Sequence, residues 1–288
     1  MKKILIPIDF SEYSQCATNY ACQMIQKNNS KHEIDLLYVF INHSNLYANH
    51  QVSSEILGPE IKKIETKMLI LQEDLKLRYP EIKTNTYYQH GNLYEEVSKA
   101  TASFPYDAVL MGTKGASGLE AIFIGSNTYD VIANAKTPVL AIPGETENFK
   151  KDRVALLCNF KIAEIDALQQ AITLIGNDFE LVLIHVNKDD RDIQDIDTEF
   201  RAWIETIIEK TGIDNISYTV KSQMLYNRSA ENVSHAISNV LIDEQIDILL
   251  ITKSRKSIFR KLIEENIVKK VAYNLFVPTL FARVYPKK

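Results

Sequence analysis

The sequence is poor in the residues that mark several protein classes. Its three cysteines, Cys16, Cys22 and Cys158, are odd in number and lack a Cys-x2-Cys spacing, so neither a disulfide framework nor a zinc site is indicated. No run of about 18 apolar residues occurs, and the apolar run after Met1 is too short for a secretory signal. We therefore expect a cytoplasmic protein without a membrane partner.

An excess of basic charge is also missing. The chain has 33 Lys and Arg residues against 37 Asp and Glu residues, a net charge of −4 and a pI near 5.9. Proteins that bind nucleic acid normally carry a concentrated positive surface, so we expect small-molecule partners and no nucleic acid. The length of 288 residues, of which 45% are hydrophobic, favours two globular domains.

What the sequence does contain is an internal repeat. Residues 3–10 align with residues 153–160, and three later apolar segments of the first half recur in the same order in the second half. Such self-similarity indicates a duplicated structural unit. We place the domains at residues 1–145 and 151–288, joined by a short polar linker.

Each unit alternates short apolar runs with helical patterns. In the first unit the runs at 3–8, 34–40, 84–89, 107–111 and 138–142 predict strands of a parallel sheet that is covered on both faces. Ser11 is predicted to cap the first helix, and Asn92 with Glu95 predicts a capping box for the third. The predicted fold class is α/β, with two tandem doubly wound domains of five parallel strands each.

The scarce glycines gather behind the fourth predicted strand. Gly112, Gly115 and Gly125, the last followed by Ser126, form the pattern Gly-x2-Gly-x9-Gly-Ser, and Gly125-Ser126 is predicted to open the fourth helix. Glycine lets backbone N–H groups approach an anion, and a helix N-terminus attracts negative charge. The pattern favours a phosphate site. The alternative is a tight turn that binds nothing.

This pattern resembles the nucleotide-binding signature of the universal stress protein family, and the chain is similar to that family over essentially its whole length. The resemblance implies strand order 3-2-1-4-5 in each unit. It also implies that the fifth strands pair, residues 139–142 with 279–284, which makes the chain its own dimer and leaves a further homodimer open. The implied ligand is ATP, or AMP or ADP, with Mg²⁺ bridging its phosphates.

The resemblance further implies a regulatory protein that acts on an unknown protein partner and is not an enzyme, apart from slow ATP hydrolysis. The glycines and the start of the fourth helix would hold the phosphates. The end of the first strand would bind ribose and base, and the backbone of Val39 would meet adenine. The residues assigned to the nucleotide are Pro7, Ile8, Asp9, Val39, Met111, Gly112, Lys114, Gly115, Gly125, Ser126, Asn127 and Thr128.

Some of these residues have a second interpretation. The carboxylate of Asp9 would accept a hydrogen bond from a ribose hydroxyl, but an acidic residue there also caps the following helix. Lys114 could approach phosphate or remain a solvated surface lysine. Residues 42–59 form a long connection that could cover the nucleotide or could be a surface segment.

The second unit departs from the pattern. Thr252-Lys253-Ser254-Arg255 stands where the first unit has its glycines, and Asn159 replaces Asp9. Side chains then occupy the space that backbone amides need. We expect one nucleotide per chain, with the second unit as a structural partner. The alternative function is a scaffold that binds no nucleotide.

Overall fold

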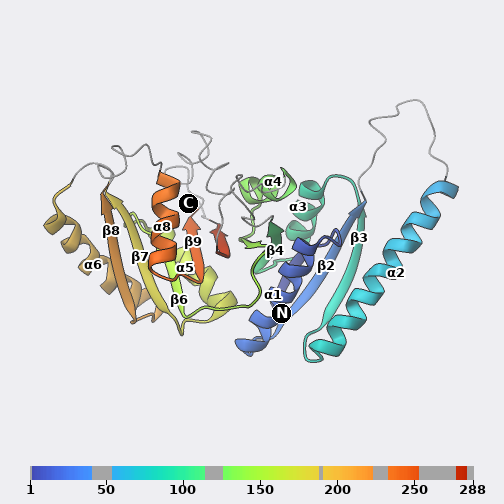
Figure 1. Cartoon of the computed structure of the whole chain (residues 1–288), viewed down its shortest axis with the longest axis horizontal. Coiled ribbons are helices and arrows are strands. Elements are labelled where there is room, and N and C mark those ends of the chain that lie inside the picture. The colour runs from blue at the N-terminus through green and yellow to red at the C-terminus, as the bar shows by residue number, and fades with distance from the viewer. Residues whose placement is uncertain are drawn as a thin grey trace.

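The chain forms one mixed sheet of ten strands with helices on both faces (Figure 1). The structure is a computed structural model that describes residues 2–40, 54–113, 126–187, 191–222, 233–252 and 277–283. The strand order is β3-β2-β1-β4-β5-β10-β9-β6-β7-β8. Each half therefore has the order 3-2-1-4-5, as the resemblance implied. The predicted α/β fold class is confirmed.

The described elements of the first half match the predicted alternation of strands and helices. They are β1 (Lys2–Pro7), α1 (Glu12–Lys27), β2 (His32–Phe40), α2 (Ser54–Arg78), β3 (Thr84–His90), α3 (Leu93–Ser103), β4 (Ala108–Thr113), α4 (Ser126–Asn134) and β5 (Val139–Pro143). Helix α2 begins inside the residues that we had assigned to a connection, and Pro59 lies within it. The rest of that connection, residues 42–53, lies outside the described residues.

The second half repeats this alternation. Its described elements are β6 (Arg153–Leu157), α5 (Ile162–Ile175), β7 (Glu180–Asn187), α6 (Ile193–Thr211), β8 (Ile216–Ser222), α8 (Val233–Asp243), β9 (Ile248–Thr252) and β10 (Thr279–Ala282). None of the helices within the described ranges is long and apolar enough to cross a membrane.

Local capping explains where the helices of the first half begin. The hydroxyl oxygen of Ser11 accepts a hydrogen bond from the amide of Ser14 at 3.2 Å, so Ser11 is the N-cap of α1 as predicted. Asn92 caps α3 by accepting from the amides of Tyr94 at 2.9 Å and Glu95 at 3.4 Å. Among the described hydrogen bonds Glu95 does not reciprocate, so Asn92 caps the helix without the full capping box.

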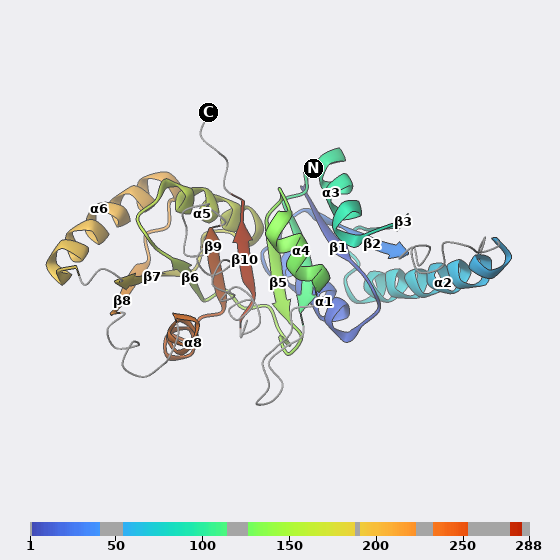
Figure 2. The same ribbon diagram turned by 90° about the horizontal axis from the view of Figure 1, so that it is seen from above.

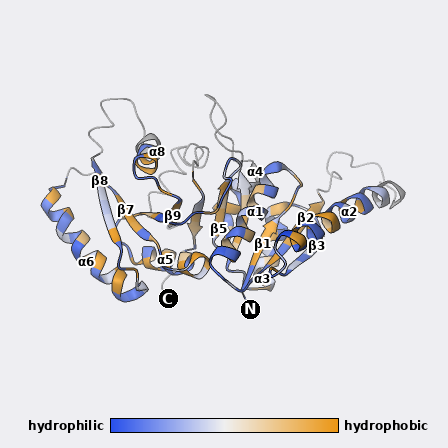
Figure 3. Cartoon of the chain, turned by 60° about the horizontal axis from the view of Figure 1, so that its bottom comes forward, coloured by the Kyte–Doolittle hydropathy of each residue, from blue (hydrophilic) through white to orange (hydrophobic). Residues whose placement is uncertain are grey.

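Two hydrophobic clusters sandwich the sheet, one on each face. Alternation along β1 sends Ile4 and Ile6 to one face and Leu5 to the other. The first cluster packs against α1, α2, α5 and α6, and the second against α3, α4 and α8. Figure 3 shows α2 and α6 as amphipathic, with hydrophilic and hydrophobic residues alternating along each helix. Both clusters continue across the two halves.

The fifth strands join the halves. Strands β5 and β10 are antiparallel, with Thr279 opposite Ala141, Leu280 opposite Leu140 and Phe281 opposite Val139. Figure 2 shows the two strands side by side at the centre of the molecule. This pairing confirms the predicted pseudo-dimer within one chain. It removes two strand edges that would otherwise be open to aggregation.

The linker between the halves is fixed to helix α1 rather than being a loose polar segment. Phe149 is 1% exposed and packs edge-to-face on Tyr20, with ring centroids 5.3 Å apart. The backbone amide of Phe149 donates to Gln23 Oε1 at 2.8 Å, and its carbonyl accepts from Lys27 Nζ at 2.7 Å. Because residues 145–150 are mostly polar, the sequence alone does not indicate that Phe149 is buried.

Replacing the anchor should weaken the whole molecule. We expect Phe149→Ala to lower the free energy of unfolding by about 3–5 kcal/mol, because a buried aromatic ring is lost and a cavity remains. Denaturant titration measures the change. The adjacent exposed side chain of Asn148 provides the control, since Asn148→Ala should cost less than about 0.5 kcal/mol. Equal effects of the two substitutions would contradict the anchoring role.

Candidate functional site

The candidate site lies where the strand order of the first half reverses. Strand β1 is flanked by β2 and β4, and Leu5 pairs with Val109 in parallel register. Asp9 and Thr113 therefore follow the two strands to the same edge of the sheet. Ligands of open α/β sheets bind at this position, outside the carboxyl ends of the strands.

Asp9 caps the turn that follows β1. Its Oδ1 accepts hydrogen bonds from the amide of Ser11 at 2.9 Å and from the Ser11 hydroxyl at 2.6 Å. Partial burial acts to raise the pKa of the carboxyl, but the hydrogen bonds from Ser11 outweigh it and hold the pKa below its usual value. The side chain is exposed and ionised at neutral pH, and neither bond engages Oδ2.

Gly112 has a packing role that sequence reasoning missed. A Cβ at this position would lie 2.0 Å from the backbone oxygen of Tyr13. Helix α1 therefore approaches β4 so closely that only glycine fits. Gly144, directly after the neighbouring β5, is also close to Tyr13, but its Cβ would meet the side chain, at 2.4 Å from Tyr13 Cδ1, and not the backbone. The glycine at 112 is required by the fold whether or not phosphate binds.

The predicted phosphate cradle is described only in part. Lys114, Gly115 and Gly125 lie outside the described residues. Helix α4 begins at Ser126 as predicted, and for Ser126 and Asn127 only the backbone is described. The side chain of Thr128 is 7% exposed and packs inward.

On the other side of the site, Pro7 and Ile8, which were predicted to pack around the base, lie at the end of β1. Both are buried, as is Met111 of β4, which was also assigned to the nucleotide. The pairing of β1 with β2 ends at Pro7 and Leu37, followed by a bond from the Ile8 amide to the Leu37 carbonyl at 2.8 Å. Val39 lies two residues further along β2.

The backbone amide and carbonyl of Val39 point toward the β1 side of strand β2, at a position beyond the last residue of β1. The carbonyl of Leu37 bonds toward β1, and the carbonyl of Phe40 bonds toward β3 by accepting from the Gly91 amide at 3.0 Å. Because neighbouring residues of a strand bond in opposite directions, Val39 points toward β1. The described part of the chain offers its amide no partner there.

A chain of aromatic rings crosses the ends of β1, β2 and β3, and the sequence did not reveal it. Phe10 contacts Tyr38 with centroids 5.6 Å apart, Tyr38 contacts Phe40 at 4.8 Å, and Phe40 stacks on His90 at 4.8 Å. Phe10 has a left-handed backbone with φ of 61°. Its counterpart Phe160 has φ of 58°, so this unusual turn belongs to the repeated unit and not to one ligand site.

The equivalent place in the second half is filled by side chains. Glu164 on α5 is 1% exposed, and its Oε1 accepts from the amide of Asn159 at 2.7 Å. The buried ring of Phe200 packs on Phe160 at 4.9 Å and stacks on Tyr218 at 4.1 Å. The second half thus has a fully buried ring, Phe200, in contact with the half-buried Phe160, whereas Phe10, Tyr38 and Phe40 of the first half are all half-buried.

Comparison with known proteins agrees with this arrangement. Residues 1–143 match the sequence pattern of the universal stress protein family. Through its first half, the chain belongs to the universal stress protein family. One universal stress protein of Methanocaldococcus jannaschii is 29% identical over 146 residues, which are 49% of this chain and 81% of that protein. A second from the same organism is 28% identical over 154 residues, or 49% and 94%.

The whole chain shares its fold with a tandem-length relative. A universal stress protein from Archaeoglobus fulgidus superposes with a TM-score of 0.72 over 98% of both chains, at 21% identity. The fold of the second half is thus also that of a universal stress protein. Within the described ranges, no group of three or more His, Cys, Asp or Glu residues is placed to hold a metal ion.

The two glycine environments give a direct test of the packing role of Gly112 in this universal stress protein. Gly112→Ala should lower the free energy of unfolding by at least about 1–3 kcal/mol, because the new methyl group collides with the backbone of α1. Gly58 lies in helix α2 with open space around it. Gly58→Ala should stay within about 0.5 kcal/mol of the parent chain, because the gain in helix propensity is offset by the contact of the new Cβ with Pro59. A tolerated alanine at position 112, measured by thermal and denaturant unfolding, would contradict the close contact.

Glu164 should impose a pH dependence on stability. Burial raises the pKa of its carboxyl to about 7. The folded protein thus holds the proton more tightly than the unfolded chain, whose glutamate titrates near about 4.3. The contribution of Glu164 to the free energy of unfolding is fully present below about pH 4. It decreases by roughly 3 kcal/mol as the pH rises to 7.

Glu164→Gln keeps an oxygen for the Asn159 amide but cannot ionise. We expect this variant to lose the decrease between pH 4 and 7 and to be more stable than the parent chain at pH 7.5. Denaturant titrations at several pH values compare the two proteins. Parallel pH profiles would show that Glu164 is not the titrating group.

Proposed function

We propose that this universal stress protein binds one adenine nucleotide, ATP or its diphosphate or monophosphate, at the switch point between β1 and β4 of its first half. Nucleotide occupancy would regulate a protein partner in the cytoplasm, and rapid catalytic turnover would not be part of the function. The observation that carries the proposal is the convergence of an ionised Asp9, the free backbone of Val39 and the start of α4 at one edge of the sheet.

Adenine and ribose would lie over the end of β1. The amide and carbonyl of Val39 can form the edge-on hydrogen bonds that a strand normally gives to its neighbour, with adenine in the place of the missing strand. The buried side chains of Ile8 and Met111 lie on opposite faces of the sheet, so the base would pack against one of them and not both. Asp9 uses Oδ1 for its own turn, and Oδ2 can accept from a ribose hydroxyl.

The phosphates would lie at the N-terminus of α4. The first amides of a helix have no partner within the helix, and the helix dipole adds partial positive charge there. Ser126, Asn127 and Thr128 provide these amides. Mg²⁺ could be bound through the phosphates themselves, since this ion keeps several waters and needs few protein ligands.

The second half is the weaker candidate for a nucleotide. At the position of Gly112 it has Thr252, which pairs with Ala282 of β10 and carries a buried side chain. Asn159 has no negative charge, and its amide already bonds to Glu164. These substitutions support a single site per chain.

A nucleotide-free scaffold is the second candidate function. It is favoured by the finding that Gly112 and Asp9 both have structural roles without any ligand. Their presence alone therefore cannot establish binding.

Calorimetry with Mg-ATP separates the two functions. We expect a stoichiometry near one for the parent chain. Asp9→Asn should weaken binding by about 10- to 100-fold, because one charged hydrogen bond is lost while the acceptor for Ser11 is kept. Gly115→Val should abolish binding.

The matched control is Asn159→Ala, which changes the equivalent position of the second half and should leave ATP affinity unchanged. Failure of the folded parent chain to bind ATP, ADP or AMP would favour the scaffold. Two bound nucleotides per chain would contradict the single site.

A further inference from the structure

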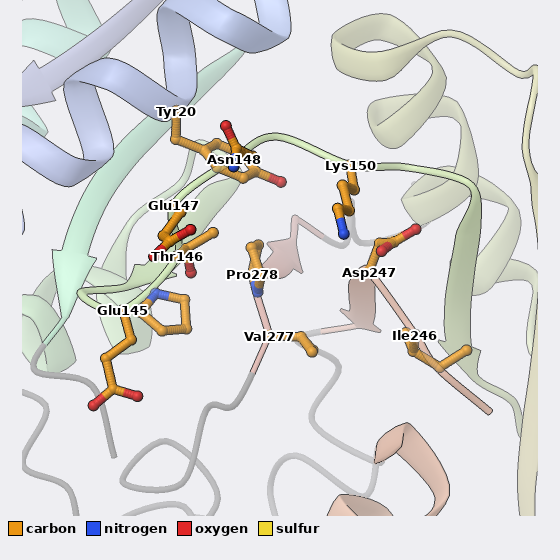
Figure 4. A pocket seen from close by; sticks show the side chains of 11 residues that line it. Tyr20, Glu145, Thr146, Glu147, Asn148, Lys150, Ile246, Asp247, Val277 and Pro278 are labelled. Carbon is orange, nitrogen blue, oxygen red and sulfur yellow. The ribbon is translucent and has the colours of Figure 1, made fainter. Parts of the chain in front are cut away.

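A pocket of about 400 Å³ lies at the junction of the two halves, in a different place from the switch point (Figure 4). Its wall combines helix α1 of the first half, the linker, and the residues that precede β9 and β10 in the second half. Pockets of this volume are typical of small-molecule sites. Only the duplicated chain can form it, because three separate parts of the chain contribute.

Tyr20 places an unsatisfied hydroxyl at this pocket. The residue is 2% exposed, and its phenol oxygen has no hydrogen-bond partner in the described part of the chain. In Figure 4 its side chain extends from α1 beneath the linker, toward the side where Lys150 and Asp247 lie. Burial, and in addition the negative charge of Asp247, raise the pKa of Tyr20 far above its usual value. The hydroxyl is therefore neutral and can both donate and accept.

Asp247 and Lys150, which carry opposite charges, also line this pocket, and each has polar atoms without a hydrogen-bond partner among the described residues. Asp247 Oδ2 accepts from the backbone amide of Arg153 at 3.1 Å, which leaves Oδ1 without a partner among the described residues. Lys150 makes no ion pair within the same ranges, and Figure 4 shows its ammonium directed toward the pocket. A half-buried carboxylate such as that of Asp247 is normally paired, whereas Lys150 is exposed and can hold its charge in water.

The rest of the wall is mixed, and it is held in place. Pro143, Ile246, Val277 and Pro278 provide an apolar part, and the linker residues Glu145, Thr146, Glu147 and Asn148 complete the lining. On one side the linker is fixed through the contacts of Phe149 with α1 that were described above. On the other side, the backbone amide of Asp247 donates a hydrogen bond to the carbonyl of Arg153 at 2.9 Å. The pocket is therefore formed before any ligand arrives.

We propose that this pocket binds a free amino acid with an apolar side chain. The ammonium group pairs with Asp247 Oδ1, the carboxylate pairs with Lys150, and the Tyr20 hydroxyl adds a hydrogen bond to the same zwitterion. The side chain of the ligand packs on the apolar part of the wall, formed by Pro143, Ile246, Val277 and Pro278. A simple amine would leave Lys150 without a partner, and a simple acid would face the carboxylates of Asp247, Glu145 and Glu147, so a molecule with both charges fits best.

A matched series of ligands tests this chemistry on the full chain. Calorimetry with L-phenylalanine, phenethylamine and 3-phenylpropionate compares the zwitterion with molecules that lack the carboxylate or the ammonium. We expect L-phenylalanine to bind at least about tenfold more tightly than either analogue, because each analogue loses one charge-assisted contact. Absence of L-phenylalanine binding, or equal binding of an analogue, would overturn the proposal.

Substitutions locate the binding and separate it from folding defects. Tyr20→Phe should keep or raise the melting temperature without ligand, because the lost hydroxyl has no partner, and should weaken L-phenylalanine binding by about tenfold. Tyr106→Phe is the contrast, since the hydroxyl of Tyr106 donates to Asp35 Oδ2 at 2.7 Å. That variant should melt earlier and bind normally. Unchanged binding in Tyr20→Phe would rule out this pocket.

The charged partners are tested in the same way. Lys150→Gln should weaken the binding of L-phenylalanine and 3-phenylpropionate but not that of phenethylamine. Asp247→Asn should weaken the binding of L-phenylalanine and phenethylamine but not that of 3-phenylpropionate. Asp107→Asn changes the corresponding aspartate of the first half, whose Oδ2 accepts from the Lys3 amide at 3.2 Å, and should leave all three titrations unchanged. ATP affinity of these variants provides an independent readout, because the nucleotide proposal can fail without affecting this one.

Discussion

The antiparallel pairing of β5 with β10 is the interaction on which the rest of this structure depends. It joins two five-stranded units into one sheet, so that the hydrophobic cluster on each face continues from one unit into the other. It also brings the end of β5 close to the start of β10, because antiparallel strands run in opposite directions. The linker, α1 and the second unit then meet around one pocket that neither unit has alone.

The two units have the same topology but different chemistry at the same edge of the sheet. In the first unit Asp9 is exposed and charged, and Gly112 keeps α1 against β4. In the second unit the carboxyl group at this edge is the buried one of Glu164, and the buried ring of Phe200 packs on Phe160. One half thus keeps a charged, exposed carboxylate at a place where the other half has packed side chains.

Sequence periodicity was sufficient for the strands and for the Ser11 cap, because both are local properties. The strand order and the joining of the fifth strands came from the family resemblance and were confirmed. The close approach of Tyr13 to Gly112 could not be predicted, because it is a contact between residues distant in the chain. For the same reason, Phe149 looked like part of a polar linker, and the aromatic rings from Phe10 to His90 looked like unrelated residues.

The internal strand pairing has a consequence for exchange between related proteins. A separate protein that offers a similar strand edge to β5 would have to displace β10, which is tethered to the same chain and is present at an effective concentration of roughly millimolar. Exchange of subunits with single-unit relatives is therefore disfavoured by mass action. The edges of β5 and β10 are therefore taken within the chain, and among the described strands only β3 and β8 keep an open edge for another copy.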